Sequence, residues 1–213
     1  HRQLILPQLA GPGVSAHRVQ KLSGFKVIYG PIRAADLPAF LDTGLEATPE
    51  MRLKMFPTRD RVVLIPMELV GALKAVLILM AVFFLPDSIL GTGGFWTNAL
   101  RHGLFSVFAI LMAIIAGAVL TPLLLPWLPG RAFSVKALVP SILAALCFAS
   151  IRLGGSHALA LQIETVAWLL LIPALSTFLA MNFTGASTYT SLSGVKKEMR
   201  WALPFQIGAG IVG

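Results

Sequence analysis

The stretch VVLIPMELVGALKAVLILMAVFFL, residues 62–85, decides the fold of this chain. At about 1.5 Å of rise per residue, a helix of this length exceeds the roughly 30 Å hydrocarbon layer of a bilayer. Outward from it, the preceding residues are polar enough for water, and further apolar runs follow at 103–128, 135–153, 157–181 and 201–213. We therefore predict an all-α polytopic membrane domain of about five transmembrane helices over residues 62–213, with the last span truncated.

The composition favours the same class of protein. Of the 213 residues, 56% are hydrophobic and only 12% are charged, against about 25% charged residues in soluble domains. The net charge of +8 can indicate nucleic-acid binding, but here the basic residues flank the membrane domain and lack interleaved aromatic side chains. We expect the lipid bilayer, and no nucleic acid, as a partner.

The basic residues of the short connections are distributed unequally between the two sides of the predicted membrane domain. One side carries Arg131, Lys136, Lys196, Lys197 and Arg200, and the other carries Arg101 and Arg152. Cytoplasmic loops carry the excess of Lys and Arg. We therefore predict a multi-pass protein of the inner (cytoplasmic) membrane whose N-terminal domain is cytoplasmic.

Residues 1–46 show a βαβα pattern of alternating elements. The short apolar run of residues 3–6 predicts a strand, residues 14–23 a helix that ends at Gly24, and residues 25–29 a second strand. Asp36 is placed to cap a second helix that has a proline in its first turn. This order implies parallel strands, and two strands are too few for an independent core. We expect the C-terminal part of a larger α/β domain, in a chain cut at both ends, joined to the membrane by a basic linker at 47–61.

Few residues offer chemistry. The nucleophile elbow, zinc, P-loop and dinucleotide motifs are absent from the sequence. Gly11 and Gly13, between a strand and a helix, could let a ligand approach the helix N-terminus, although any βα connection has such a turn. His17 could be a ligand but is more simply a surface residue, and Cys147 stands alone inside an apolar run. Lys74 and Glu164 are expected at similar depth in the membrane, where intramembrane charges usually pair.

Several segments together resemble one known family, the membrane-anchored corrinoid protein of the microbial mercury-methylating pair. The segments are HRQLILPQL (1–9), GPGV (11–14) with Ala16 and His17, GFKVIYGP (24–31), DLPAFL (36–41), ATPEMR (47–52) and the Thr184 to Arg200 loop. The resemblance covers essentially the whole chain. It implies a partial corrinoid-binding domain related to the large subunit of the corrinoid iron–sulfur protein of the acetyl-CoA pathway.

The resemblance also implies an activity and a set of partners. Proteins of this family are corrinoid-dependent methyltransferases that pass a methyl group from a cobalamin-type cofactor to inorganic Hg(II), and a ferredoxin-like protein with two [4Fe–4S] clusters reduces the cobalt. The axial cysteine of the family is expected upstream of His1, so no catalytic or metal-binding residue is assigned in this chain, which alone should be inactive. The residues expected to line the corrin are Gly11, Gly13, Val14, Tyr29 and Gly30.

Two other functions remain open from the sequence. The helices could themselves transport a substrate such as a metal ion, although the spans contain few polar residues. Alternatively, the chain could be a corrinoid methyl carrier that serves a different acceptor.

Overall fold

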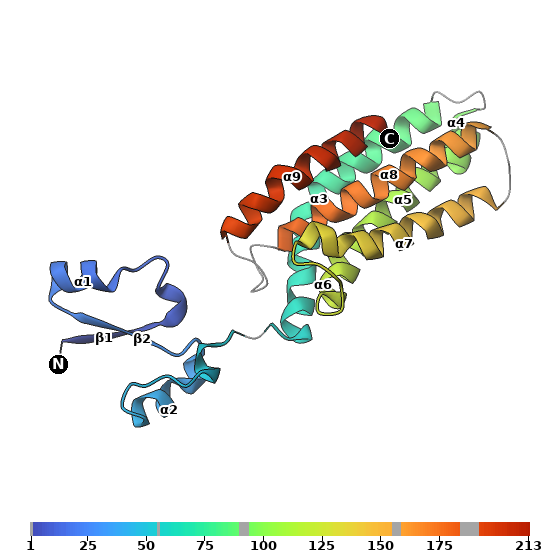
Figure 1. Ribbon diagram of the computed structural model, residues 1–213. Coiled ribbons are helices and arrows are strands. Elements are labelled where there is room, and N and C mark those ends of the chain that lie inside the picture. The colour runs from blue at the N-terminus through green and yellow to red at the C-terminus, as the bar shows by residue number, and fades with distance from the viewer. Residues whose placement is uncertain (1, 55, 90–93, 155–158, 184–191) are drawn as a thin grey trace. The chain divides into compact units, whose positions relative to one another are not determined.

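The computed structural model describes residues 2–54, 56–89, 94–154, 159–183 and 192–213. The chain forms two compact units, residues 1–55 and residues 56–213. The first unit holds a small two-stranded sheet with short helices, and the second is helical (Figure 1).

The first unit has the predicted order of elements. These are β1 (Gln3–Pro7), α1 (Ala16–Ser23), β2 (Lys26–Gly30) and α2 (Leu37–Asp42). The two strands are parallel, with Gln3 opposite Lys26 and Pro7 opposite Gly30. Gly24 ends α1 in the left-handed conformation at φ 73°, where glycine carries no steric penalty. The predicted βαβα pattern and its parallel pairing are confirmed.

Side-chain details of this unit differ from the expectation. Leu22 of α1 is 84% exposed, whereas Phe40 of α2 is fully buried. Asp36 is the N-cap residue of α2 as predicted, but its side chain makes no capping hydrogen bond. Gly11 has a helical φ of −52°, so its turn does not depend on a left-handed glycine.

Three single-turn 3₁₀ helices complete the first unit: η1 (Gln8–Ala10), η2 (Ala34–Asp36) and η3 (Glu50–Arg52). The Ile32 N–H, two residues after β2, donates a hydrogen bond to the Met51 carbonyl at 3.0 Å. This bond connects the segment that follows α2 to the end of β2. The predicted linker at 47–61 is thus divided, since its last residues form the first turn of the long helix α3.

The second unit contains long helices interrupted by short irregular turns. Its elements are α3 (Thr58–Ile89), α4 (Phe95–Asn98), the π-helical segment η4 (Ala99–Gly103), α5 (Leu104–Ile114), the π-helical segment η5 (Ile115–Leu120), α6 (Thr121–Leu124), α7 (Phe133–Leu153), α8 (Leu159–Asn182) and α9 (Leu192–Val212). Within the described residues, four helices are long and apolar enough to cross a membrane: Thr58–Pro86, Phe95–Leu124, Phe133–Leu153 and Leu159–Asn182.

The four long apolar helices match four of the five predicted spans, and the fifth needs correction. We expected a truncated span at 201–213, but α9 begins at Leu192 and runs for 21 residues. Its first turns carry Lys196, Lys197, Glu198 and Arg200, so α9 is not among the helices apolar enough to span. The predicted start of the fourth span at His157, and residues 184–191 of the Thr184 to Arg200 loop, lie outside the described residues.

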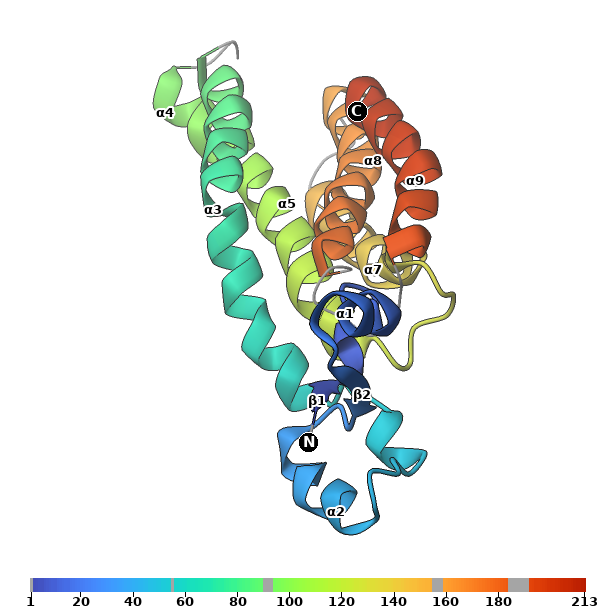
Figure 2. The same cartoon turned by 90° about the vertical axis from the view of Figure 1, so that its left-hand side faces the viewer.

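The core of this unit forms around α5 and α8, which contact each other, and α8 also contacts α7 and α9 (Figures 1 and 2). Phe148 of α7 is fully buried between the rings of Phe105, Phe108 and Trp168. Where η5 meets α8, a Cβ added to Gly117 would lie 2.3 Å from the Ser176 carbonyl oxygen. Only glycine permits this approach, as is common where helices pack closely in membranes.

Candidate functional site

Three of the five residues expected to line a corrin meet on the α1 side of the sheet. The Tyr29 hydroxyl, from the penultimate residue of β2, donates a hydrogen bond to the Val14 carbonyl just before α1. A Cβ added to Gly11 would lie 4.0 Å from the Tyr29 ring and 3.2 Å from the Gln8 carbonyl oxygen. Tyr29 therefore contacts Val14 and lies beside Gly11.

Gly30 faces the other side of the sheet, because successive residues of a strand point to opposite faces. A Cβ added to Gly30 would lie 3.1 Å from Ile5 Cγ2 and 3.4 Å from Phe40 Cε1. Gly13 has space around it, since its added Cβ would meet only the Ala10 carbonyl, at 3.9 Å. The five predicted residues are thus divided between the two faces of the sheet and the turn before α1.

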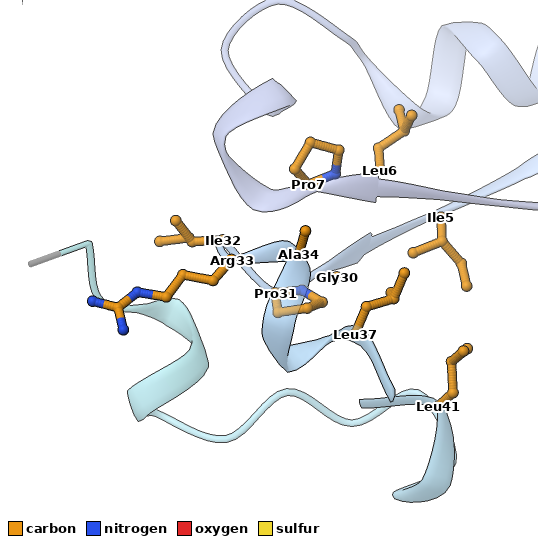
Figure 3. Close-up of a pocket in the computed structure, with 10 residues that line it drawn as sticks. All are labelled: Ile5, Leu6, Pro7, Gly30, Pro31, Ile32, Arg33, Ala34, Leu37 and Leu41. Atoms are coloured by element: carbon orange, nitrogen blue, oxygen red, sulfur yellow. The ribbon is translucent and has the colours of Figure 1, made fainter. Parts of the chain in front are cut away.

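A cavity of about 310 Å³ lies on the α2 side, where both strands end. Gly30 is the one predicted residue that lines it; the rest of the lining comes from the end of β1, the segment after β2 and α2. Figure 3 shows Ile5, Leu37 and Leu41 on one side of it and the Arg33 side chain extending on the other. Ligands of parallel α/β sheets bind at the carboxyl ends of the strands, so the Gly30-Pro31 strand end was the signal that could have located it.

The lining of this cavity determines what it can do. Its side chains are apolar except for Arg33, whose guanidinium offers hydrogen-bond donors and a permanent positive charge. The lining holds no nucleophile and no titratable acid or base, so this cavity is suited to binding and not to acid–base chemistry. His17, the other residue considered as a ligand, is exposed on α1.

The structure offers no metal centre among the residues it describes. No group of three or more His, Cys, Asp or Glu side chains there could hold a metal ion. The chain's single cysteine, Cys147, is an exposed residue of α7 in the helical unit.

The helical unit contains a charged cluster that joins three of its elements. Arg152, near the end of α7, donates from Nη2 to both Glu164 carboxylate oxygens, at 2.9 and 3.1 Å. His102 Nδ1 lies 3.1 Å from Glu164 Oε2 and 3.1 Å from Arg152 Nη2. The guanidinium also lies 4.2 Å from the centre of the Phe105 ring, a cation–π contact. Glu164 is therefore paired with Arg152 and His102, and the predicted pairing with Lys74, which is exposed on α3, is wrong.

Two buried cations, Arg61 of α3 and Lys136 of α7, bond the carbonyls at the end of α6 and in the turn that follows it. Arg61, 3% exposed, donates from Nη1 to the carbonyls of Pro122 and Leu123 at 3.2 and 3.0 Å. Lys136, 6% exposed, donates to the carbonyls of Leu125 and Leu128 at 2.8 and 2.7 Å. The last carbonyls of a helix have no partner within it, so the two cations satisfy the end of α6 and the turn that follows.

An acidic side chain complements these cations at the start of α7. Glu198 of α9, 4% exposed, accepts a hydrogen bond from the Ser134 N–H at 2.7 Å. The first N–H groups of a helix are likewise unpartnered within it and favour a negative charge. The basic residues at 61 and 136, interpreted from the sequence as flanking charges, thus make interior contacts of the helical unit, as does Glu198.

Comparisons of the chain with protein-family models, with curated proteins and with solved structures found no match.

Proposed function

We propose that this chain belongs to a membrane-anchored corrinoid protein that transfers a methyl group to inorganic Hg(II) and forms methylmercury. The observation that carries the proposal is the resemblance of three segments in the first unit, GPGV, GFKVIYGP and DLPAFL, to that family. They fall on the βα turn, on β2 and on α2, the elements that surround the carboxyl ends of the strands. A parallel α/β edge of this kind is where a cofactor binds in such sheets.

The cavity beside Gly30 is compatible with the edge of a corrinoid. A corrinoid is a broad, largely apolar ring with amide side chains, and when bound it supplies the transferable methyl group. Ile5, Leu37 and Leu41 would contact the ring edge, and Arg33 would donate hydrogen bonds to amide oxygens. The family's axial thiolate has no counterpart within residues 2–54, because the chain's one cysteine is Cys147. In this proposal residues 2–54 hold and orient the cofactor, and the cobalt takes no ligand from them.

The membrane arrangement is the second part of the proposal. The four long apolar helices cross the inner membrane, and the first unit lies on its cytoplasmic side, because Lys and Arg are more frequent in the connections on that side. A ferredoxin-like protein with two [4Fe–4S] clusters acts from the cytoplasm as the reductant. The helical unit serves as the anchor.

The direct test of the activity uses the natural gene in its source organism. Deleting the gene should abolish the formation of methylmercury from added Hg(II), and the intact gene should restore it. A gene carrying Cys147→Ala should restore it equally, because Cys147 is an exposed residue of α7. Unchanged methylation after deletion would refute the proposal. If deletion changed the uptake of mercury by the cells and left methylation unchanged, the result would favour the transport alternative.

The cavity can be tested separately from the activity. Ala34 lines it and the neighbouring Ala35 does not, and both are exposed. Ala34→Phe in the natural full-length protein should reduce the corrinoid that co-purifies, measured by its visible absorption and by cobalt content. The matched variant Ala35→Phe should leave it unchanged. Equal corrinoid content in the two variants would exclude this cavity as the binding wall.

A further inference from the structure

A second cavity, open to the surface, lies on the helical unit beside the charged cluster. Its volume is about 460 Å³, within the range of about 300–1,000 Å³ for pockets that bind small molecules. α3, α5, α8 and Gly213, which follows α9, contribute its walls, and Phe83, Ser106 and Trp168 are among the lining residues. The rings of Phe83 and Trp168 are tilted against each other with centroids 5.1 Å apart, and both residues line the cavity.

The polar groups of this cavity are few, which restricts its ligand. Apart from the Ser106 hydroxyl, the polar side chain in the lining is Glu164. A carboxylate only accepts hydrogen bonds, and each of its oxygens has two lone pairs. Glu164 Oε1 accepts one bond from Arg152, at 3.1 Å, and so retains the capacity to accept another.

The charge of the cluster excludes charged ligands. The Arg152 guanidinium, 2.9 Å from Glu164 Oε2, compensates the carboxylate and disfavours a second cation. An anion would be repelled by the Glu164 carboxylate. A pure hydrocarbon would leave the accepting oxygen facing an apolar group, at the cost of an unmade hydrogen bond. An uncharged molecule with a hydroxyl donor and an aromatic body fits all three conditions.

We propose that this cavity binds an uncharged, lipid-soluble aromatic alcohol of the phenol or quinol class. The hydroxyl donates to Glu164 Oε1, and the ring lies against Phe83 and Trp168. The site is independent of the methyl-transfer proposal, since it involves no residue of the first unit.

The test uses bromine, which quenches tryptophan fluorescence on contact. The chain has four tryptophans; replacing Trp96, Trp127 and Trp201 by Phe leaves Trp168 as the only emitter. In lipid vesicles, 4-bromophenol should quench Trp168 saturably, whereas bromobenzene, which lacks the hydroxyl, should quench it weakly and without saturation. A second protein that retains only Trp127, 74% exposed and outside the cavity, reports the partitioning of each probe into the membrane.

Two variants separate binding in the cavity from general contact. Ala167→Phe fills the cavity without altering the charged cluster and should abolish saturable quenching; Ala81→Phe, at an exposed position of α3 outside the lining, should not. Glu164→Gln should raise the concentration of 4-bromophenol at half-saturation about tenfold, because hydrogen bonds to a charged acceptor are stronger than those to a neutral one. Equal quenching by the two probes, or saturable quenching that survives Ala167→Phe, would overturn the proposal.

Discussion

The two units of this chain differ in whether they bury polar side chains among the described residues, because the buried charged and hydroxyl side chains lie in the helical unit. In the first unit, Phe40 is the one fully buried large hydrophobic residue among those described, and Leu9 and Leu22 are 61% and 84% exposed. In the helical unit, charged and hydroxyl side chains such as Arg61, Thr121 and Ser176 are nearly or fully buried, while α3 has no buried residue across its most apolar stretch. Apolar surface outside and bonded polar groups inside are typical of helices packed in lipid.

This difference indicates that different interactions stabilise each unit. Buried hydroxyls of the helical unit donate to helix carbonyls, as Ser176 does to Ala113 and Ile172 at 3.0 and 2.7 Å. Close approach and satisfied polar groups hold that unit together, because lipid supplies little hydrophobic force between helices. The first unit depends on its sheet and on a few hydrogen bonds between elements, such as Tyr29 to Val14. We therefore expect substitutions to have larger effects in the helical unit.

The largest effect is expected at the closest helix contact. Gly117→Ala places a methyl group 2.3 Å from the Ser176 carbonyl oxygen, which forces η5 and α8 apart. We expect a loss of stability of about 3 kcal/mol, measured by denaturant titration of helicity in detergent. Gly71→Ala, inside α3 at a position with no atom within 4 Å of the added Cβ, is the matched control and should not destabilise the unit, because alanine favours a helix more than glycine does. Similar stability of the two variants would contradict the packing described for η5.

Removing a buried cation should have the next largest effect. Arg61→Met leaves the carbonyls of Pro122 and Leu123 without their donor, and we expect a loss of about 2 kcal/mol. Arg59→Met, which changes an exposed residue of the same helical turn, should alter stability far less in the same denaturation assay. If the two substitutions proved equivalent, Arg61 would act only as a flanking charge.

The charged cluster should show a pairwise energy. In a double-mutant cycle of Arg152→Met and Glu164→Gln, we expect a coupling energy of about 2 kcal/mol, because each single substitution removes the Arg152–Glu164 ion pair and leaves the other side chain without that partner. A cycle of Lys74→Met with Glu164→Gln should be additive, since Lys74 is exposed and Glu164 is bonded to Arg152. Coupling in the second cycle and not in the first would restore the pairing expected from sequence.

The smallest effect is expected in the first unit. Tyr29→Phe removes the hydroxyl that bonds the Val14 carbonyl and should lower local stability by about 1 kcal/mol. Hydrogen exchange should accelerate for the amides of β1 and β2 and stay unchanged in α7 and α8. Faster exchange in the helices would mean that the two units do not unfold separately.

The sequence predicted elements that have a strong local signal. Gly24 and the short apolar runs located α1, β1 and β2, and the long apolar runs located α3, α7 and α8 to within a few residues. The start of α9 was missed because Lys196, Lys197 and Arg200 resemble a polar loop. A helix satisfies its own backbone hydrogen bonds whatever its side chains, so charge alone did not mark its boundary.

The sites depended on contacts that no local pattern contains. Ile5 and Leu41 reach one cavity only after the strands pair and α2 folds beneath them. Arg152 and Glu164 are 12 positions apart and meet because α7 and α8 are packed against each other. The sequence prediction paired Glu164 with Lys74 because the two residues lie at similar depth in the membrane. That argument considered the position along the membrane normal and not the direction of each side chain.

The central proposal is that the two units meet different solvents, with lipid around the long apolar helices and, as proposed above, cytoplasm around the first unit. Single cysteines placed at exposed positions in a Cys147→Ser background test it, with a membrane-impermeant maleimide as the label in intact cells stripped of their outer layers. Thr97→Cys, in α4, should react at once; Arg33→Cys should react only after permeabilisation; and Leu143→Cys, exposed on α7, should stay unlabelled in both conditions. Labelling of Arg33→Cys in intact cells, or of Leu143→Cys in either state, would contradict the account.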